Sequence, residues 1–130
     1  MRNKDVIKTQ VNDVFELIKI RLGIDYSDPN KIPEESISEF PYSNVNSMQI
    51  PILNVKNKII DAIDREDALD ALKYLYAVKH KLVKIFENKI IVKMSRNNKL
   101  FKAPARKLRV YSVIDDKINK LIRLITKNAD

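Results

Sequence analysis

Five acidic side chains lie within ten residues of one another, and carboxylates are the groups that bind Mg²⁺ for phosphoryl chemistry. They are Asp61, Asp64, Glu66, Asp67 and Asp70. Acidic residues also gather where one helix ends and the next begins, because they cap free backbone N–H groups and favour the positive end of the helix dipole. Asp61 with Arg65, and Asp70 with Lys73, have the spacing of ion pairs on a helix face. We therefore expect helix capping and surface ion pairs here, and no metal site.

Other side chains offer little material for catalysis. His80 is the only histidine, the chain has no cysteine, and no acid stands three or four residues from His80. Zinc ribbons, thiol nucleophiles and disulfide scaffolds are thereby excluded, as is Ser-His catalysis through any residue but His80. The single glycine leaves no P-loop and no GxGxxG turn. The sequence predicts a protein that is not an enzyme and uses no cofactor.

The charge distribution predicts an acidic partner for the C-terminal part of the chain. The net charge is +8, yet residues 1–80 hold 11 basic and 13 acidic side chains, whereas residues 81–130 hold 14 basic and 4 acidic. The densest group of basic residues within the acid-free interval 88–114 has seven members, namely Lys93, Arg96, Lys99, Lys102, Arg106, Lys107 and Arg109. Clustered Lys and Arg neutralise phosphates, and Phe101 and Tyr111 add surfaces on which unpaired bases stack. The same surface also suits an acidic protein, or serves solubility alone as a solvated rim, so all three interpretations remain open.

Helical periodicity accounts for most of the chain that positions these residues. Apolar side chains recur every three or four residues over 4–22, 52–63, 67 to about 94, and 104–127, with Gly23 at the position of a left-handed C-cap. The third helix is expected to bury a seam of Leu69, Leu72, Tyr76, Val83, Phe86 and Ile90, with Leu75, Leu82 and Ile85 beside it. Short joints between the last three helices favour an all-α, four-helix bundle in one domain spanning 1–130.

Two segments interrupt this pattern. Residues 24–51 contain four of the five prolines and form a long acidic connection, in which Pro33 is suited to begin a short helix through Ser38 or Glu39. Residues 89–103 fit either the end of the third helix, to about Met94, or a β-hairpin. With a hairpin, the two preceding helices would form a winged helix-turn-helix, although the acidic start of the second one weakens that model.

Hydrophobicity and composition bear on the cellular location of the protein and on the growth temperature of its source. No apolar run approaches the roughly 20 residues that span a membrane, and residues 1–20 do not resemble a signal peptide, so we expect a cytoplasmic protein. Scarce glycine, absent cysteine and abundant Lys and Ile suit a thermophile, whereas twelve asparagines argue against one.

Part of the third predicted helix resembles the central helix of the GINS DNA replication factor family. The residues that carry the resemblance are Tyr74-Leu75-Tyr76, followed by Lys79 and by Lys81-Leu82-Val83-Lys84-Ile85. The resemblance covers residues 67–127, and the helix after Pro104 corresponds to the next long helix of that family. It implies a non-catalytic scaffold within a replisome. The small β domain that accompanies the family's helical domain has no room in 130 residues.

We accordingly expect a non-catalytic subunit of a nucleic-acid-processing assembly, binding DNA or RNA, other protein subunits, or both, and forming homo- or hetero-oligomers. The competing hypotheses are a helical structural or adaptor protein, of the kind found in viruses or as a small subunit of CRISPR effectors, and a winged-helix DNA-binding regulator.

Overall fold

The described part of the chain folds into four α-helices and one small sheet. The computed structural model describes residues 1–33, 49–97 and 105–129, and for residues 33, 87–97 and 105–108 the backbone alone. The helices are α1 (Lys4–Leu22), α2 (Val55–Asp64), α3 (Ala68–Asn97) and α4 (Ala105–Asn128), with a 3-10 turn at Ile52–Asn54 before α2. Strands β1 (Lys31–Pro33) and β2 (Gln49–Pro51) pair antiparallel. The predicted all-α, bundle-like fold is confirmed.

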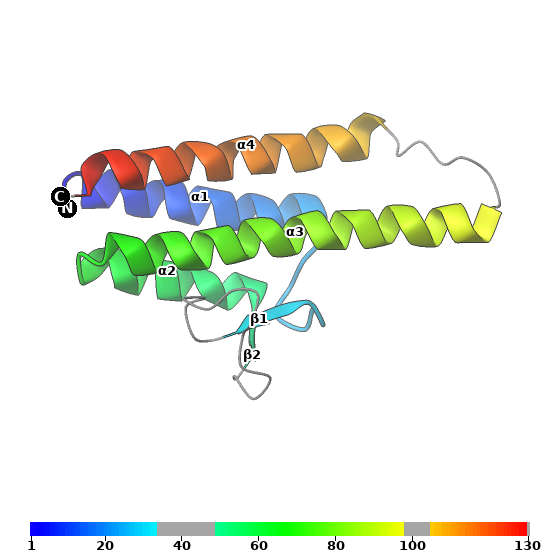
Figure 1. Ribbon diagram of the computed structural model, residues 1–130, viewed down its shortest axis with the longest axis horizontal. Coiled ribbons are helices and arrows are strands. Elements are labelled where there is room, and N and C mark those ends of the chain that lie inside the picture. Colours follow the sequence, from blue (N-terminus) through cyan, green and yellow to red (C-terminus); the bar gives the residue numbers. More distant parts are fainter. Residues whose placement is uncertain (34–48, 98–104, 130) are drawn as a thin grey trace.

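Successive helices run in opposite directions and close into a bundle. α1 packs against both α2 and α4, and α3 packs against both α2 and α4, so each helix has two helical neighbours (Figure 1). Both termini lie at one end of the bundle, while α3 projects beyond the others at the opposite end. The two-stranded sheet lies beside the bundle, where β1 contacts α3. The up-and-down order follows from the short joint between α2 and α3 and from helices that each bury one face.

The predicted stripes of α1 and α4 form the centre of the core. α1 buries Ile7, Val11, Val14, Phe15 and Ile18, and α4 buries Ile114, Ile118, Leu121 and Ile125. Gly23 follows α1 with a φ of 65°, which confirms the predicted left-handed C-cap. The predicted second and fourth helices are also present, each within a few residues of its expected bounds.

The predicted apolar seam of α3 is wrong in part. Leu69, Tyr76 and Val83 are 64%, 53% and 44% exposed, although all three were expected to be buried. Leu75, Leu82 and Ile85, predicted beside the seam, are buried, and Leu72 and Phe86 are partly buried, whereas the side chain of Ile90 lies outside the described residues. The other buried side chains in the described part of α3 are Ala71, Tyr74, Ala77 and Val78.

The two interrupted segments differ in outcome. Residues 89–97 belong to α3, so the first strand of the proposed hairpin, and with it the wing of a winged helix, is absent. Helical periodicity was therefore the better guide than strand propensity. Pro33, expected at the start of a short helix, is the last residue of β1, and the remaining residues of that helix lie outside the described part of the chain.

Polar contacts fasten the two chain ends together. Asn128 is 4% exposed, its side-chain oxygen accepts a hydrogen bond from Asn3 Nδ2 at 2.9 Å, and its Nδ2 donates to the Leu124 carbonyl at 2.8 Å. The backbone N–H of Arg2 donates to the carbonyl of Asn128 at 3.1 Å. These bonds satisfy a buried amide and fix the end of α4 against the start of α1.

Candidate nucleic-acid interface

Five of the seven predicted basic residues lie on two helix ends at the same end of the molecule. Lys93 and Arg96 are in the last turns of α3, and Arg106, Lys107 and Arg109 are in the first turns of α4. α3 and α4 pack against each other in opposite directions, so these helix ends share one end of the molecule (Figure 1). Arg109 is exposed. Lys99, Lys102 and Phe101 lie outside the described residues.

Tyr111, predicted as a stacking surface, is partly buried. Its ring lies 4.4 Å from that of Phe86, centroid to centroid, with the two planes tilted by 40°. Its hydroxyl is buried and has no hydrogen-bond partner among the residues with described side chains, and burial raises the pKa of this side chain. One side of the ring is thus already packed against α3, while base stacking by Tyr111 stays a prediction.

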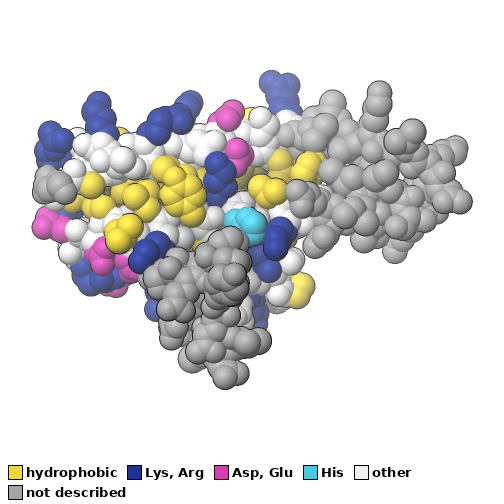
Figure 2. All heavy atoms as spheres, viewed as in Figure 1, with side chains coloured by type: hydrophobic (Ala, Val, Ile, Leu, Met, Phe, Trp, Pro, Cys, Tyr) yellow, Lys and Arg dark blue, Asp and Glu magenta, His cyan; other side chains and the backbone are white. Residues whose placement is uncertain are grey.

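The structure extends the basic surface along α4. After Arg109, the exposed side chains of this helix include Lys117, Lys120, Arg123 and Lys127. We call these five residues the α4 basic row. At 3.6 residues per turn, Arg109, Lys120 and Lys127 align along the helix, and Lys117 and Arg123 flank them. Lys and Arg side chains project along α4 at the upper edge of Figure 2.

The predicted basic surface ended at Arg109, within the acid-free interval that Asp115 and Asp116 close. Asp115, however, faces Lys79 of α3 at 3.8 Å. Lys79 also donates a hydrogen bond to Asn119, whose side-chain nitrogen donates to Asp115 at 3.3 Å. Asp115 is therefore directed into the contact between α3 and α4, which leaves Asp116 as the acid on the exposed face of the row. The spacing of Lys117, Lys120, Arg123 and Lys127 was the signal that would have found these residues.

The acidic cluster at 61–70 surrounds one arginine. Arg65 Nε donates to Asp61 at 3.0 Å, Arg65 Nη2 donates to Asp70 at 3.0 Å, and Asp67 lies 3.6 Å from Arg65 Nη1. Hydrogen bonds to Asp70 and then to Asp61 raise the pKa of Arg65. The carboxylate of Asp67 accepts the backbone N–H of Asp70 at 3.0 Å and so caps the first turn of α3. The expected ion pair of Asp61 with Arg65 is present, whereas Asp70, expected to pair with Lys73, pairs with Arg65 instead.

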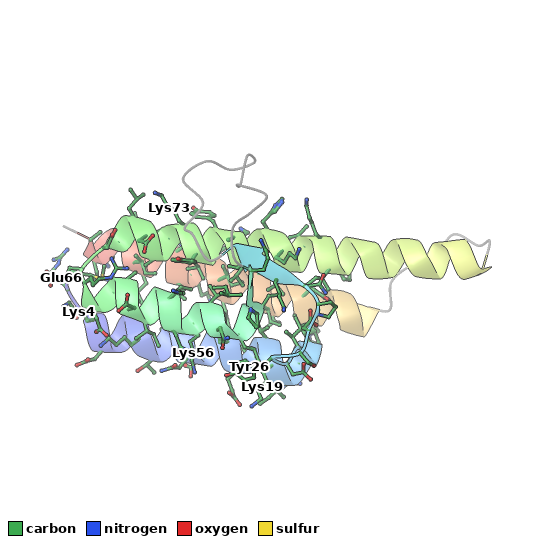
Figure 3. All side chains as sticks on the ribbon, turned by 90° about the horizontal axis from the view of Figure 1, so that it is seen from below. Lys4, Lys19, Tyr26, Lys56, Glu66 and Lys73 are labelled. Carbon is green, nitrogen blue, oxygen red and sulfur yellow. The ribbon has the colours of Figure 1, made fainter. Side chains whose placement is uncertain are left out.

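Glu66 forms ion pairs with the start of the chain. Its carboxylate lies 3.1 Å from Lys4 Nζ and 3.5 Å from the N-terminal nitrogen, and Figure 3 shows Lys4 and Glu66 side by side. Hydrogen bonding with Lys4, followed by the charges of Lys4 and the N-terminus, lowers the pKa of Glu66. Asp64 pairs with Lys8 of α1. Over the ranges with described side chains, no group of three or more His, Cys, Asp and Glu side chains is placed to hold a metal ion.

The structure places the remaining candidates of α3 on different faces of the helix. His80 is exposed on the outer face of the helix, in the same direction as Tyr76. Tyr74, by contrast, is 7% exposed and contributes to the core.

None of the helices, as far as their residues are described, is long and apolar enough to cross a membrane. Comparisons of this chain with protein-family models, with curated proteins and with solved structures found no match.

Proposed function

We propose that this protein is a non-catalytic, nucleic-acid-binding subunit of a larger assembly. The observation that carries the proposal is the α4 basic row together with the basic ends of α3 and α4. Phosphate binding needs several cations that are exposed, close together and not already neutralised. None of the five residues of the row forms an ion pair with another described residue, and all five are exposed.

The length of the row suits a nucleic-acid backbone. Arg109 and Lys127 are 18 residues apart on one helix, which corresponds to about 27 Å at 1.5 Å per residue. Cations along such a line contact successive phosphates without reading bases, so we expect weak sequence preference. Bases would enter as stacking partners only if an aromatic side chain such as Phe101 reaches them.

The resemblance of residues 67–127 to the GINS helical domain supplies the most specific form of this proposal, a replisome scaffold. A long helix followed by an antiparallel long helix is consistent with it, since α3 and α4 have that arrangement.

The salt dependence of binding tests the proposal. Fluorescence anisotropy with labelled duplex DNA, single-stranded DNA and single-stranded RNA would be measured from low to moderate salt. If five phosphates are neutralised, log K falls with log salt at a slope of about −4.5 for duplex DNA and about −3.5 for single strands. Absent binding, or binding that is insensitive to salt, would refute direct nucleic-acid contact and favour the adaptor hypothesis.

A further inference from the structure

The outer face of α3 carries an apolar strip that no other described element covers. Leu69, Tyr76 and Val83 stand seven residues apart and are 64%, 53% and 44% exposed. Leu72 and Phe86, which are partly buried, continue the strip towards α4. Positions 69, 72, 76, 83 and 86 share the three-and-four spacing by which one helix packs against another. Figure 2 shows hydrophobic side chains gathered over α3 and its boundary with α4.

A hollow deepens one end of this strip. It has a volume of about 220 Å³ and lies between α3 and α4. Its walls are mostly apolar, from Leu82, Val83, Phe86, Tyr111, Ile114 and Ile118, while Lys79 and Asp115 close one side. Tyr111 lines this hollow, and its buried hydroxyl has no hydrogen-bond partner among the described residues. A strip of apolar side chains leading into a hollow is the surface that receives an amphipathic helix.

Cations border the strip along both of its long sides. Lys73 and Lys84 flank it on α3, and α4 beside it carries the exposed cations Lys120, Arg123 and Lys127, with the exposed acid Asp116 on the same face. None of the five cations has an ion-pair partner within the described part of the chain. An occupant with acidic flanks would complement these cations, and like charges placed opposite them would be unfavourable.

We propose that the α3–α4 strip is a docking site for an acidic amphipathic helix of a partner protein. The apolar side of that helix packs on Leu69, Tyr76 and Val83 and places one side chain in the hollow. Its acidic flanks face Lys73 and Lys84 on one side and the α4 cations on the other. The distance from Leu69 to Val83 is about 21 Å along the helix, so the partner helix needs roughly four turns.

The border charges also oppose a second copy of this chain as occupant. Two copies meeting through this strip would bring Lys73 and Lys84 of one chain towards the same lysines and the α4 cations of the other. A symmetric interface places the same patch on both subunits, so this repulsion would occur twice. The proposal concerns protein binding at the apolar strip, and it shares Lys120, Arg123 and Lys127 with the α4 basic row. The peptide measurements below use no nucleic acid, so their outcome is separate from that of the salt-dependence test.

A designed probe tests the proposal on the full-length protein. The probe is an 18-residue, fluorescein-labelled helical peptide with leucines at heptad a and d positions and glutamates flanking them. A second peptide has the same composition but shuffled leucines, so that it has no apolar face. We expect saturable binding of the first peptide in anisotropy measurements and at least tenfold weaker binding of the shuffled one.

The variants locate the site. Tyr76→Ala with Val83→Ala removes exposed side chains of the strip and is expected to weaken probe binding about tenfold or more. The matched control is Val6→Ala with Ile20→Ala, which removes two exposed apolar side chains of α1 that are 52% and 65% exposed. This control is expected to bind as the unmodified chain does.

Three outcomes would overturn the proposal. The first is no binding of the heptad peptide, or equal binding of both peptides, which would show that no apolar face is recognised. The second is an equal loss in the control variant. The third is a dimer of the unmodified chain, detected by light scattering, that the Tyr76→Ala and Val83→Ala variant dissolves. That last result would make a second copy the occupant.

Discussion

Removing the hydroxyl of Tyr111 should make the protein more stable. This hydroxyl is buried and has no hydrogen-bond partner in the described part of the chain, whereas the ring centroid lies 4.4 Å from that of Phe86. Phenylalanine keeps the ring contact and removes the unsatisfied polar group. A buried polar group without a partner costs about 1 to 3 kcal/mol. Because Tyr111 is only partly buried, we take the lower end of that range and expect Tyr111→Phe to raise the free energy of unfolding by about 1 kcal/mol.

Urea denaturation followed by circular dichroism measures this difference, and thermal unfolding should show a rise of about 3 to 5 °C. Tyr76→Phe is the matched control, since Tyr76 is 53% exposed and its loss of a solvated hydroxyl should change stability very little. A Tyr111→Phe variant that is less stable than the unmodified chain would refute the reasoning, because it would mean that the hydroxyl is hydrogen-bonded.

The buried hydroxyl of Tyr111 should also make the stability of the protein depend on pH in the alkaline range. Burial raises the pKa of Tyr111 in the folded state above the usual tyrosine value of about 10. The contribution of the protonated Tyr111 to the free energy of unfolding is therefore fully present below about pH 10. It is lost as the pH rises through the folded-state pKa, because Tyr111 releases its proton at a lower pH in the unfolded state than in the folded state. Tyr111→Phe should reduce this alkaline loss of stability, as measured by urea denaturation between pH 8 and 11. An unchanged pH dependence would contradict the predicted direction of the shift.

Three further changes test other parts of the structure. Leu75→Ala should cost about 2 to 5 kcal/mol of unfolding free energy because Leu75 is fully buried, whereas Leu69→Ala, at a site 64% exposed, should cost less than about 0.5 kcal/mol. Equal losses in urea denaturation would mean that α3 is rotated from its described orientation. Gly23→Ala should destabilise by about 1 kcal/mol, entirely through its φ of 65°, since a Cβ there meets no atom within 4 Å, and Gly23→Asn should cost less. A neutral Gly23→Ala would argue against the left-handed cap. Contact with Lys4 is the chief cause that lowers the pKa of Glu66 in the folded state. Glu66 therefore stabilises the fold at a pH above its unfolded-state pKa of about 4.3, and this stabilisation is lost as the pH falls through the folded-state pKa. Glu66→Gln should therefore reduce the fall in melting temperature on acidification, and an unaltered fall would contradict the Lys4 contact.

The sequence predicted elements more successfully than it predicted faces. The α1 and α4 stripes are regular, so their periodicity identified both the helices and the buried side chains, including Ile7, Ile18, Ile118 and Ile125. α3 has apolar residues on two faces, and periodicity does not say which one meets the other helices. Leu69, Tyr76 and Val83 suggested one face, yet all three are exposed. The buried face combines Leu75, Leu82 and Ile85 with the small residues Ala71 and Ala77.

The candidate site was predicted in part for a similar reason. A count of charges located the basic half of the chain and the Lys93 to Arg109 interval. It treated Asp115 as a charge that ends the basic surface, because the contact of Asp115 with Lys79 joins residues 36 positions apart and depends on how α3 and α4 pack. The acidic cluster was predictable, since helix caps and ion pairs such as Asp61 with Arg65 are local in sequence.

The most direct test of nucleic-acid binding compares two charge reversals of equal size. One variant carries Arg109→Glu and Lys120→Glu in the α4 basic row, and the other carries Lys19→Glu and Arg21→Glu, both exposed in the last turn of α1. If the α4 row contacts phosphates, the first variant loses about tenfold or more in affinity for DNA and RNA, and its log K against log salt slope falls by about 2. The α1 variant should stay close to the unmodified chain. Equal losses in both variants, or none in the α4 variant, would contradict the proposed function.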